Sequence, residues 1–295
     1  MLDSFKKKVQ VRFQGKCEWI GELKVQHVLP NKFIQAIGPF VFLEHVICQK
    51  QTSSESQTHP SSNIAHPHRG IATLTYILFG EVQHQDSMEN KVKLSSGGAH
   101  WMKAGKGVMQ DETVSSLCRI TNMDVSVIQF WVNLPSRHKA DEPNYISLQP
   151  DEIPTRILDN DSGWIKTLLG EFEDVMAKVP SDSNEFACHI LLNPEKNISI
   201  KTKKSFEYAA FIPTGWTEIN DTEFQSGELV LFSSFGEMIE ISNKSEKSVN
   251  IILFGGEPYE EQIVTEGAFV MNTPHEISQA YNDYYDGKYD LIKHK

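Results

Sequence analysis

Hydrophobic positions along the chain gather in short runs of β-branched and aromatic residues, each closed by Gly, Asn, Asp or Pro. Runs of this length between turn signals favour antiparallel strands over alternating strands and helices. The clearest runs span residues 71–79, 126–132, 208–212, 228–232 and 249–254. We expect each to form a strand, and the pattern predicts an all-β fold.

One segment near the C-terminus has helical spacing instead. Thr273 suits the N-cap, Pro274 suits the first helical position, and Glu276 completes a T-x-x-E capping box. Apolar residues recur at helical spacing from Ile277, and Gly287 is placed to end the helix. We expect this helix to pack its apolar stripe on a sheet.

The chain divides into two similar halves. The segment from about 135 to 161 is rich in Pro, Asp, Asn and Glu, which is typical of a connection. On each side of it, a strand and a turn lead to a Ser-Gly step and a further strand, and 295 residues suit two domains. We therefore predict two tandem barrels, at 1–135 and 162–295, joined by a linker at 136–161.

Composition narrows the classes of partner. The 28 Lys and Arg residues against 39 Asp and Glu residues give a net charge of −11, which argues against direct nucleic-acid binding. No apolar run approaches the ~20 residues of a membrane span, and no secretory signal is visible. Four scattered cysteines without a C-x-x-C pair suggest buried thiols in a reducing compartment. We expect a cytoplasmic protein without membrane contact.

The most informative motif is His66-Pro67-His68. Pro67 favours an extended path for the residue before it, and residues two apart on a strand face the same side. Both imidazoles could then point into one cavity, as in many Zn, Fe, Cu, Ni or Mn sites. With equal weight, the pair could be polar surface residues.

A second pair, Gln110 and Glu112, is also two residues apart. The Gly-rich segment 105–107 offers a tight turn that could bring this pair beside the first. His66, His68 and Glu112 would then supply two imidazoles and one carboxylate, the ligand set of many non-haem oxygenases. Gln110 could be a fourth ligand through its amide oxygen or could hold a water. The alternative for Gln110 and Glu112 is a solvated turn and strand end.

Longer motifs carry a resemblance to a known family. The runs H-P-H-R-G (66–70), T-Y-I-L-F-G-E-V (75–82), H-Q-D-S (84–87) and W-M-K-A-G-K-G (101–107) resemble the pirin family. Segments 37–45, 129–135, 140–145, 256–258 and 267–273 are also similar to pirin segments. The resemblance covers nearly the whole chain in the family's order.

The resemblance implies a bicupin: two antiparallel β-sandwich barrels in tandem, with a C-terminal helix and a metal in the N-terminal barrel only. Pirins typically bind iron through three histidines and one glutamate. Some act as quercetin 2,3-dioxygenases, which open a flavonol ring with O2 and release CO. Others are partners of transcription factors or metabolic enzymes, and the family resemblance suggests a monomer.

Carried onto this sequence, the first two histidine positions match His66 and His68, and the glutamate matches Glu112. The third histidine position falls on Gln110, which departs from the family pattern. His100 stands where pirins commonly have Gln, and Ala72 where they commonly have Glu. We expect His100 to lie outside the direct ligands or at the surface. The remaining histidines, His84 among them, have no partner at ligand spacing, so we expect surface or hydrogen-bonded core roles for them.

These observations support two hypotheses. In the first, the chain is a metal-binding cupin and a quercetin 2,3-dioxygenase-type enzyme acting on a flavonol-like substrate and O2. Its metal ligands would be His66, His68, Gln110 and Glu112, with Glu112 also the catalytic base. The cofactor would be one mononuclear transition metal, with iron expected first and Mn, Ni, Cu or Zn as alternatives. In the second, the chain is a non-catalytic regulator that binds a protein partner.

Overall fold

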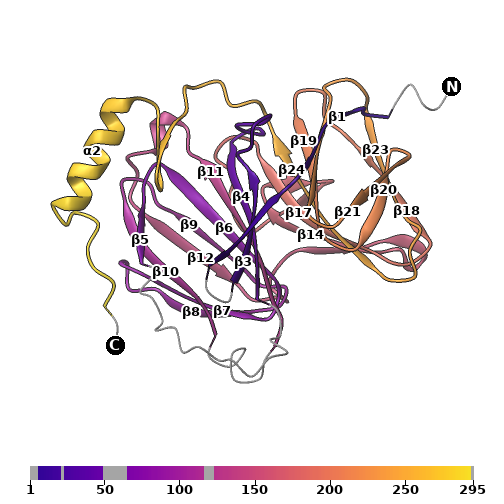
Figure 1. Cartoon of the computed structure of the whole chain (residues 1–295), viewed down its shortest axis with the longest axis horizontal. Helices are drawn as coiled ribbons and strands as arrows, with labels where there is room; N and C mark the ends of the chain where they lie inside the picture. Colours follow the sequence, from indigo (N-terminus) through magenta and orange to yellow (C-terminus); the bar gives the residue numbers. More distant parts are fainter. Residues whose placement is uncertain (1–5, 21–22, 49–64, 116–122, 294–295) are drawn as a thin grey trace. The chain divides into compact units, whose positions relative to one another are not determined.

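The computed structural model describes residues 6–20, 23–48, 65–115 and 123–293, and strands dominate it (Figure 1). Neighbouring strands pair antiparallel, as residues 71–79 do with 125–133 and residues 186–192 do with 249–256. All five hydrophobic runs singled out in the sequence form strands, within β6 (Ile71–Phe79), β11 (Val125–Asn133), β19 (Glu207–Thr214), β22 (Glu228–Phe232) and β24 (Val249–Gly256). The prediction of an antiparallel all-β fold is confirmed.

The chain forms two compact units that interleave in sequence. Unit 1 comprises Met1–Lys16, Gln26–Phe42 and Ile153–Tyr259, and unit 2 comprises Cys17–Val25, Leu43–Glu152 and Glu260–Lys295. This grouping differs from the contiguous division at 1–135 and 162–295, because strand pairing places an early strand in unit 1 and helix packing places the C-terminal helix in unit 2. The longest continuous stretch of unit 2 ends inside the predicted linker 136–161.

Two antiparallel sheets enclose the apolar core of unit 2, although residues 16, 26–29 and 40–42 of their strands are assigned to unit 1. One sheet has the strand order β12-β9-β6-β11-β4-β3-β2, and the other has the order β5-β10-β7-β8. Ile77 and Val127 of the first sheet pack with Val82 and Leu94 of the second. The strands are β2 (Lys16–Ile20), β3 (Leu23–Leu29), β4 (Phe40–Cys48), β5 (His66–His68), β7 (Glu81–Asp86), β8 (Lys91–Ser95), β9 (Ala99–Lys103), β10 (Val108–Val114) and β12 (Asn144–Leu148), with β6 and β11 as above.

Unit 1 repeats this architecture with its own core. Its seven-stranded sheet has the order β1-β22-β19-β24-β17-β14-β13, and its four-stranded sheet has the order β18-β23-β20-β21. Ile190, Phe224, Ile241 and Leu253 are among its fully buried core residues. The remaining strands are β1 (Val9–Gln14), β13 (Thr155–Ile157), β14 (Gly163–Leu169), β15 (Glu171–Phe172), β16 (Val175–Met176), β17 (Phe186–Leu192), β18 (Lys196–Lys201), β20 (Trp216–Ile219), β21 (Thr222–Gln225) and β23 (Met238–Asn243).

The predicted C-terminal helix is α2 (Pro274–Tyr285). Thr273 caps it, since its Oγ1 accepts a hydrogen bond from the backbone N–H of Glu276 at 3.2 Å. Ile277 and Ala280 are buried against Phe269 of β26 (Phe269–Met271), which pairs with β25 (Val264–Glu266). The helix therefore packs its apolar stripe on a small sheet, as its spacing predicts.

An ion pair joins this helix to the strand that carries the H-P-H motif. Arg69, directly after β5, donates through Nη1 to Asp283 of α2 at 2.5 Å and to the hydroxyl of Tyr289 at 3.2 Å. Gly70 has φ +77°, and a Cβ there would lie 2.1 Å from the carbonyl oxygen of Val270. Glycine is thus required where β5 meets the C-terminal segment.

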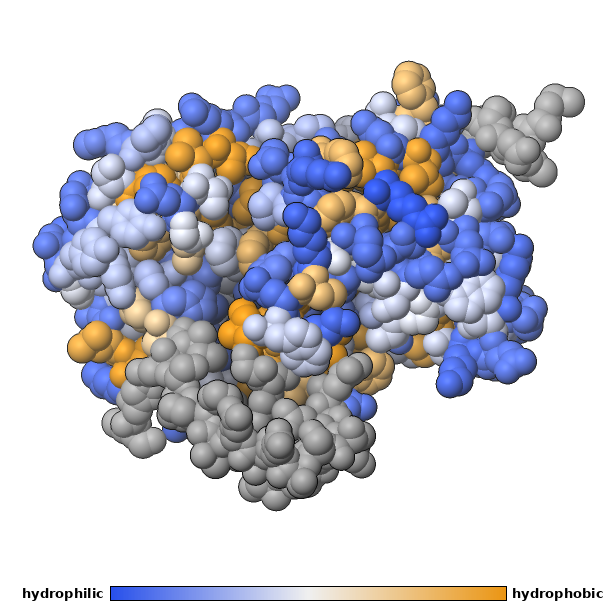
Figure 2. Space-filling view, in the orientation of Figure 1, coloured by the Kyte–Doolittle hydropathy of each residue, from blue (hydrophilic) through white to orange (hydrophobic). Residues whose placement is uncertain are grey.

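On the face shown in Figure 2, hydrophilic side chains predominate, with smaller apolar patches between them. None of the helices in the described ranges is long and apolar enough to cross a membrane. Cys188 is buried, as expected for the thiols, but Cys17 is exposed, so that expectation is wrong for Cys17. Cys118 lies outside the described residues.

Candidate functional site

The two histidines of the H-P-H motif meet on one face of β5. The motif forms an antiparallel pair with β10, in which His66 is opposite Gln110. The Nε2 atoms of His66 and His68 lie 3.0 Å apart, and Gln110 Nε2 lies 2.9 Å from His68 Nε2 and 3.4 Å from His66 Nε2. The motif is extended, as predicted, and of the pair expected beside it Gln110 lies opposite His66, whereas Glu112 lies opposite His84 of β7.

This group of three fits a transition metal. Metal–ligand bonds of about 2.1 Å place adjacent ligands about 3.0 to 3.4 Å apart, which is the spacing found between these side chains. Gln110 is fully buried, and its Oε1 has no hydrogen-bond partner. Half a turn of the amide would direct this oxygen towards the histidines. Burial, together with the neighbouring His66, lowers the pKa of His68 to about 3, so its imidazole is neutral and able to bind a metal.

Glu112, the fourth predicted ligand, faces different partners. Its Oε1 accepts a hydrogen bond from Thr75 Oγ1 at 3.1 Å, and its Oε2 accepts one from Gln129 Nε2 at 3.0 Å. Its Oε1 also lies 2.8 Å from Nε2 of His100. Among the described residues, no carboxylate oxygen of Glu112 forms a group with ring nitrogens of His66 and His68 in which all three atoms lie within 4.8 Å of one another. The predicted set is therefore divided between two neighbouring clusters.

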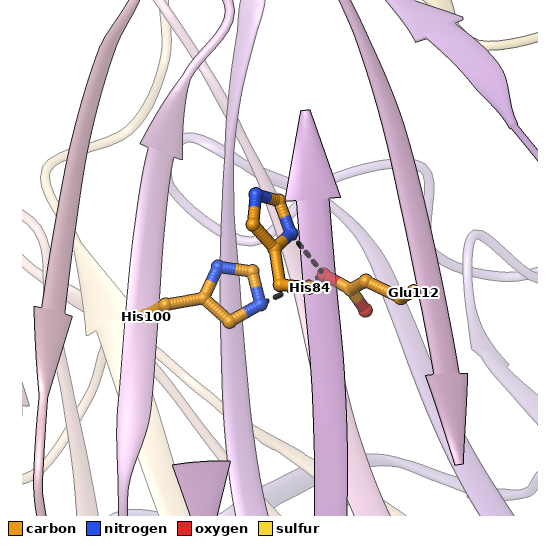
Figure 3. A group of neighbouring side chains, drawn as sticks. All are labelled: His84, His100 and Glu112. Carbon is orange, nitrogen blue, oxygen red and sulfur yellow. Dashed lines mark ion pairs between the residues drawn. The ribbon is translucent and has the colours of Figure 1, made fainter. Parts of the chain in front are cut away.

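The second cluster comprises His84, His100 and Glu112, whose ligand atoms all lie within 4.8 Å of one another (Figure 3). His84 on β7 is directly opposite Glu112 on β10, and its Nδ1 lies 3.7 Å from Glu112 Oε1. His100 lies on β9 of the other sheet, directly opposite Thr75 of β6. Both imidazoles are buried, so a surface position for His84 or His100 is wrong.

Charge and burial act against each other in the second cluster. Burial favours a neutral Glu112, but its contacts with His100 and His84 hold the pKa of its carboxyl well below the usual range. Burial lowers the pKa of His100 although Glu112 opposes this. Burial also acts to lower the pKa of His84, but its contacts with Asp86 and Glu112 outweigh this effect and raise the pKa to about 9.

Sequence reasoning missed His84 and His100 as neighbours of Glu112. His84 carried a usable signal, because it lies two residues before Asp86 and a strand would place both on one face. His100 carried no such signal. It reaches Glu112 from the facing sheet, and which rows of two sheets face each other is a property of their packing.

Comparison with known proteins agrees with the architecture. The model of the pirin family matches residues 22–132, and the model of the pirin C-terminal cupin domain matches residues 187–290. A pirin-like protein of Solanum lycopersicum is 30% identical over 284 residues, covering 96% of this chain and 91% of the relative.

Solved structures give the same result. A quercetin 2,3-dioxygenase from Acinetobacter baumannii has a TM-score of 0.86 and 26% identity, covering 98% of this chain and 100% of that one. The bacterial pirin YhhW of Escherichia coli, in complex with nickel(II), has a TM-score of 0.63 and 16% identity, covering 84% of this chain and 100% of that one. These likenesses confirm the predicted bicupin fold. Two matching cupin models in the family's order and a full-length relative at this identity show that the chain belongs to the pirin family.

Proposed function

We propose that this chain is a metal-dependent dioxygenase of the quercetin 2,3-dioxygenase type, acting on a flavonol-like substrate with O2. The observation that carries the proposal is the close approach of His66, His68 and Gln110, whose side-chain nitrogens lie 2.9 to 3.4 Å apart. The strong likeness to a structure named as a quercetin 2,3-dioxygenase supports the choice of substrate class.

In this proposal His66, His68, Gln110 and Glu112 hold one mononuclear transition metal. Glu112 would join the other three by turning from its present partners. Iron is the first candidate, with Mn, Ni, Cu or Zn as alternatives, and a related fold has been solved with nickel(II). When bound, such an ion would supply Lewis acidity for the reaction of the flavonol with O2.

The protein's own groups orient the reaction. Glu112 accepts the proton of the flavonol hydroxyl, because it is the carboxylate next to the predicted ligands. Gln129 holds one carboxylate oxygen of Glu112 and in turn accepts a hydrogen bond from Trp131 Nε1 at 3.3 Å. The ring of Trp131 packs edge-on against His68, with ring centroids 5.0 Å apart. In the structure, Gln129 and Trp131 thus link the carboxylate of Glu112 to the ring of His68.

The test uses metal-stripped protein reloaded with Fe(II), Mn(II), Ni(II) or Cu(II) and given quercetin in air. We expect loss of flavonol absorbance and release of CO with at least one metal. The His66→Ala variant should lose this activity, whereas His138→Gln should keep it, since the imidazole of His138 pairs with Asp141 away from the cluster. Unchanged quercetin with every metal would overturn the proposal for this substrate.

One observation favours the second candidate function, a regulator that acts by binding a protein partner. Gln110 replaces the histidine that the family resemblance implies, and an amide is a weaker ligand than an imidazole. A partner that co-purifies and binds His66→Ala as tightly as wild type would support this role. The cytoplasmic location, the monomeric state and the absence of nucleic-acid binding remain predictions.

A further inference from the structure

We propose that His84, His100 and Glu112 form a divalent transition-metal site of their own, independent of His66 and His68. This site differs from the ligand set that the family resemblance implies, and it goes beyond the proposed oxygenase function. Gln110 and Glu112 are two residues apart on β10, about 7 Å along the strand. The two clusters therefore lie side by side on the same face of this strand.

The three side chains converge on one point from both sheets of unit 2. His84 and Glu112 are register partners on β7 and β10, while His100 projects from β9 of the facing sheet. The closest approaches are 2.8 Å from His100 Nε2 to Glu112 Oε1 and 3.7 Å from His84 Nδ1 to the same oxygen. Ligands around a transition metal lie about 3.0 to 3.4 Å apart, so small side-chain rotations would bring these three ligand atoms to that spacing.

The buried nitrogens of this cluster lack ordinary hydrogen-bond partners. His100 has 0% of its surface exposed, and neither of its ring nitrogens makes a directed hydrogen bond within the described residues. Its Nε2 is close to Glu112, but the contact lacks hydrogen-bond geometry. His84 is 1% exposed, and its Nδ1 is likewise without a hydrogen bond. Unsatisfied buried nitrogens are costly, and a bound cation would pair with Nδ1 of His84 and Nε2 of His100.

The far side of His84 has the support usual for a metal-binding histidine. Its Nε2 lies 3.3 Å from Asp86 Oδ2, while Asp86 accepts hydrogen bonds from Met88 N at 2.9 Å and from Asn90 Nδ2 at 2.7 Å. Metal-ligating histidines commonly donate their second N–H to a carboxylate held in this way, which leaves the other nitrogen free to coordinate. The ring of Tyr145 stacks on His84, with centroids 4.7 Å apart, and fixes its plane.

Two imidazoles and one carboxylate select divalent ions of the first transition row, such as Mn, Fe, Co, Ni or Zn, over Ca or Mg. The competing explanation is a buried ion-pair network, in which a protonated His84 is held between Asp86 and Glu112. That network would bind no metal, so metal binding decides between the two.

The test is titration of metal-stripped protein with Co(II), followed by visible absorption and by cobalt content per chain. The His66→Ala/His68→Ala variant should still bind about one equivalent. Adding His100→Gln should weaken that binding at least about a hundredfold. Adding His138→Gln instead should leave it unchanged, since His138 is outside the cluster. No Co(II) uptake by the folded double variant, or unchanged uptake after His100→Gln, would overturn the proposal.

Because buried substitutions can impair folding, a second measurement uses the wild-type protein. Anomalous scattering from crystals soaked in Co(II) should show a peak within bonding distance of His84 Nδ1, His100 Nε2 and Glu112. Crystals with bound cobalt elsewhere and no peak there would contradict the assignment. Neither measurement depends on quercetin turnover, so failure of the oxygenase proposal would be seen separately.

Discussion

His100 and Glu112 meet across the interior of unit 2, with Nε2 of His100 2.8 Å from Oε1 of Glu112. One residue lies on β9 of the seven-stranded sheet and the other on β10 of the four-stranded sheet. Glu112 lies opposite His84 on β7 and two residues from Gln110 on β10. The carboxylate of Glu112 is therefore common to both proposed uses of the barrel.

The first prediction concerns the charge of Glu112. We expect Glu112→Gln to weaken total Co(II) binding and to lower quercetin turnover, each at least about a hundredfold, because a neutral amide is a poor substitute for a carboxylate ligand. Isothermal titration and the quercetin assay measure the two effects. The matched control is Glu142→Gln, because Glu142 is exposed and pairs with Lys106. This substitution should change neither metal binding nor quercetin turnover. Wild-type metal binding by Glu112→Gln would refute the shared role.

The second prediction concerns Gln110. Because its amide nitrogen lies 2.9 Å from His68 Nε2, Gln110→His would place a third imidazole beside His66 and His68. We expect the affinity of that cluster for Ni(II) or Fe(II) to rise about tenfold or more, since imidazole is the stronger ligand. Competition with a chromogenic chelator measures the change. An unchanged or weaker affinity would show that residue 110 is not directed at the metal.

The third prediction concerns the anchor of β5. Arg69 and Asp283 form an ion pair whose side chains are only 15% and 13% exposed. We expect Arg69→Gln to lower the free energy of unfolding by about 1 to 2 kcal/mol, because it removes the contacts of Arg69 with Asp283 and Tyr289. Asp283 keeps its contacts with Lys288 and Gln279, which limits the loss. Urea denaturation measures the loss. The exposed pair of Lys106 and Glu142 offers the comparison, and Lys106→Gln should change stability by less than about 1 kcal/mol.

The fourth prediction concerns pH and His189 of unit 1. Burial lowers the pKa of His189 from 6.5 to about 3, although its hydrogen bond to Asn250 Oδ1 at 2.9 Å opposes this. Between these two pKa values the unfolded chain binds a proton that the folded chain does not. The free energy of unfolding therefore falls as the pH falls from about 6.5 towards about 3, by up to about 1.4 kcal/mol per pH unit.

His189→Gln removes this titration, so its unfolding free energy should depend less steeply on pH than that of the wild type over this range. Denaturation curves of both proteins at several pH values give the difference in slope. Equal slopes would mean that His189 is protonated as readily in the folded state as in the unfolded chain.

Local pattern was enough to predict much of the fold. The β-branched runs form strands such as β6 and β22 with the expected bounds, because alternation and turn residues specify local backbone conformation. Thr273 and Glu276 likewise marked the start of α2. The interleaving of the two units was not predictable in this way, because pairing of β1 with β22 joins distant parts of the chain.

The candidate site shows the same limit. His66 and His68 are near in sequence, and a strand alone determines that they face one side. The place of His100 opposite Glu112 depends on how two sheets pack, which a single sequence does not reveal. Glu112 was therefore correctly singled out, but its nearest imidazoles were not.

The central claim, that the barrel of unit 2 carries out metal-dependent dioxygenation, is tested most directly by isotope labelling. Metal-loaded protein is given quercetin under 18O2, and the ring-opened product and the released gas are analysed by mass spectrometry. We predict that both atoms of one 18O2 enter the product and that the CO is unlabelled, with no such product from Glu112→Gln. Oxidised quercetin without the label, or labelled product formed equally by Glu112→Gln, would contradict the claim.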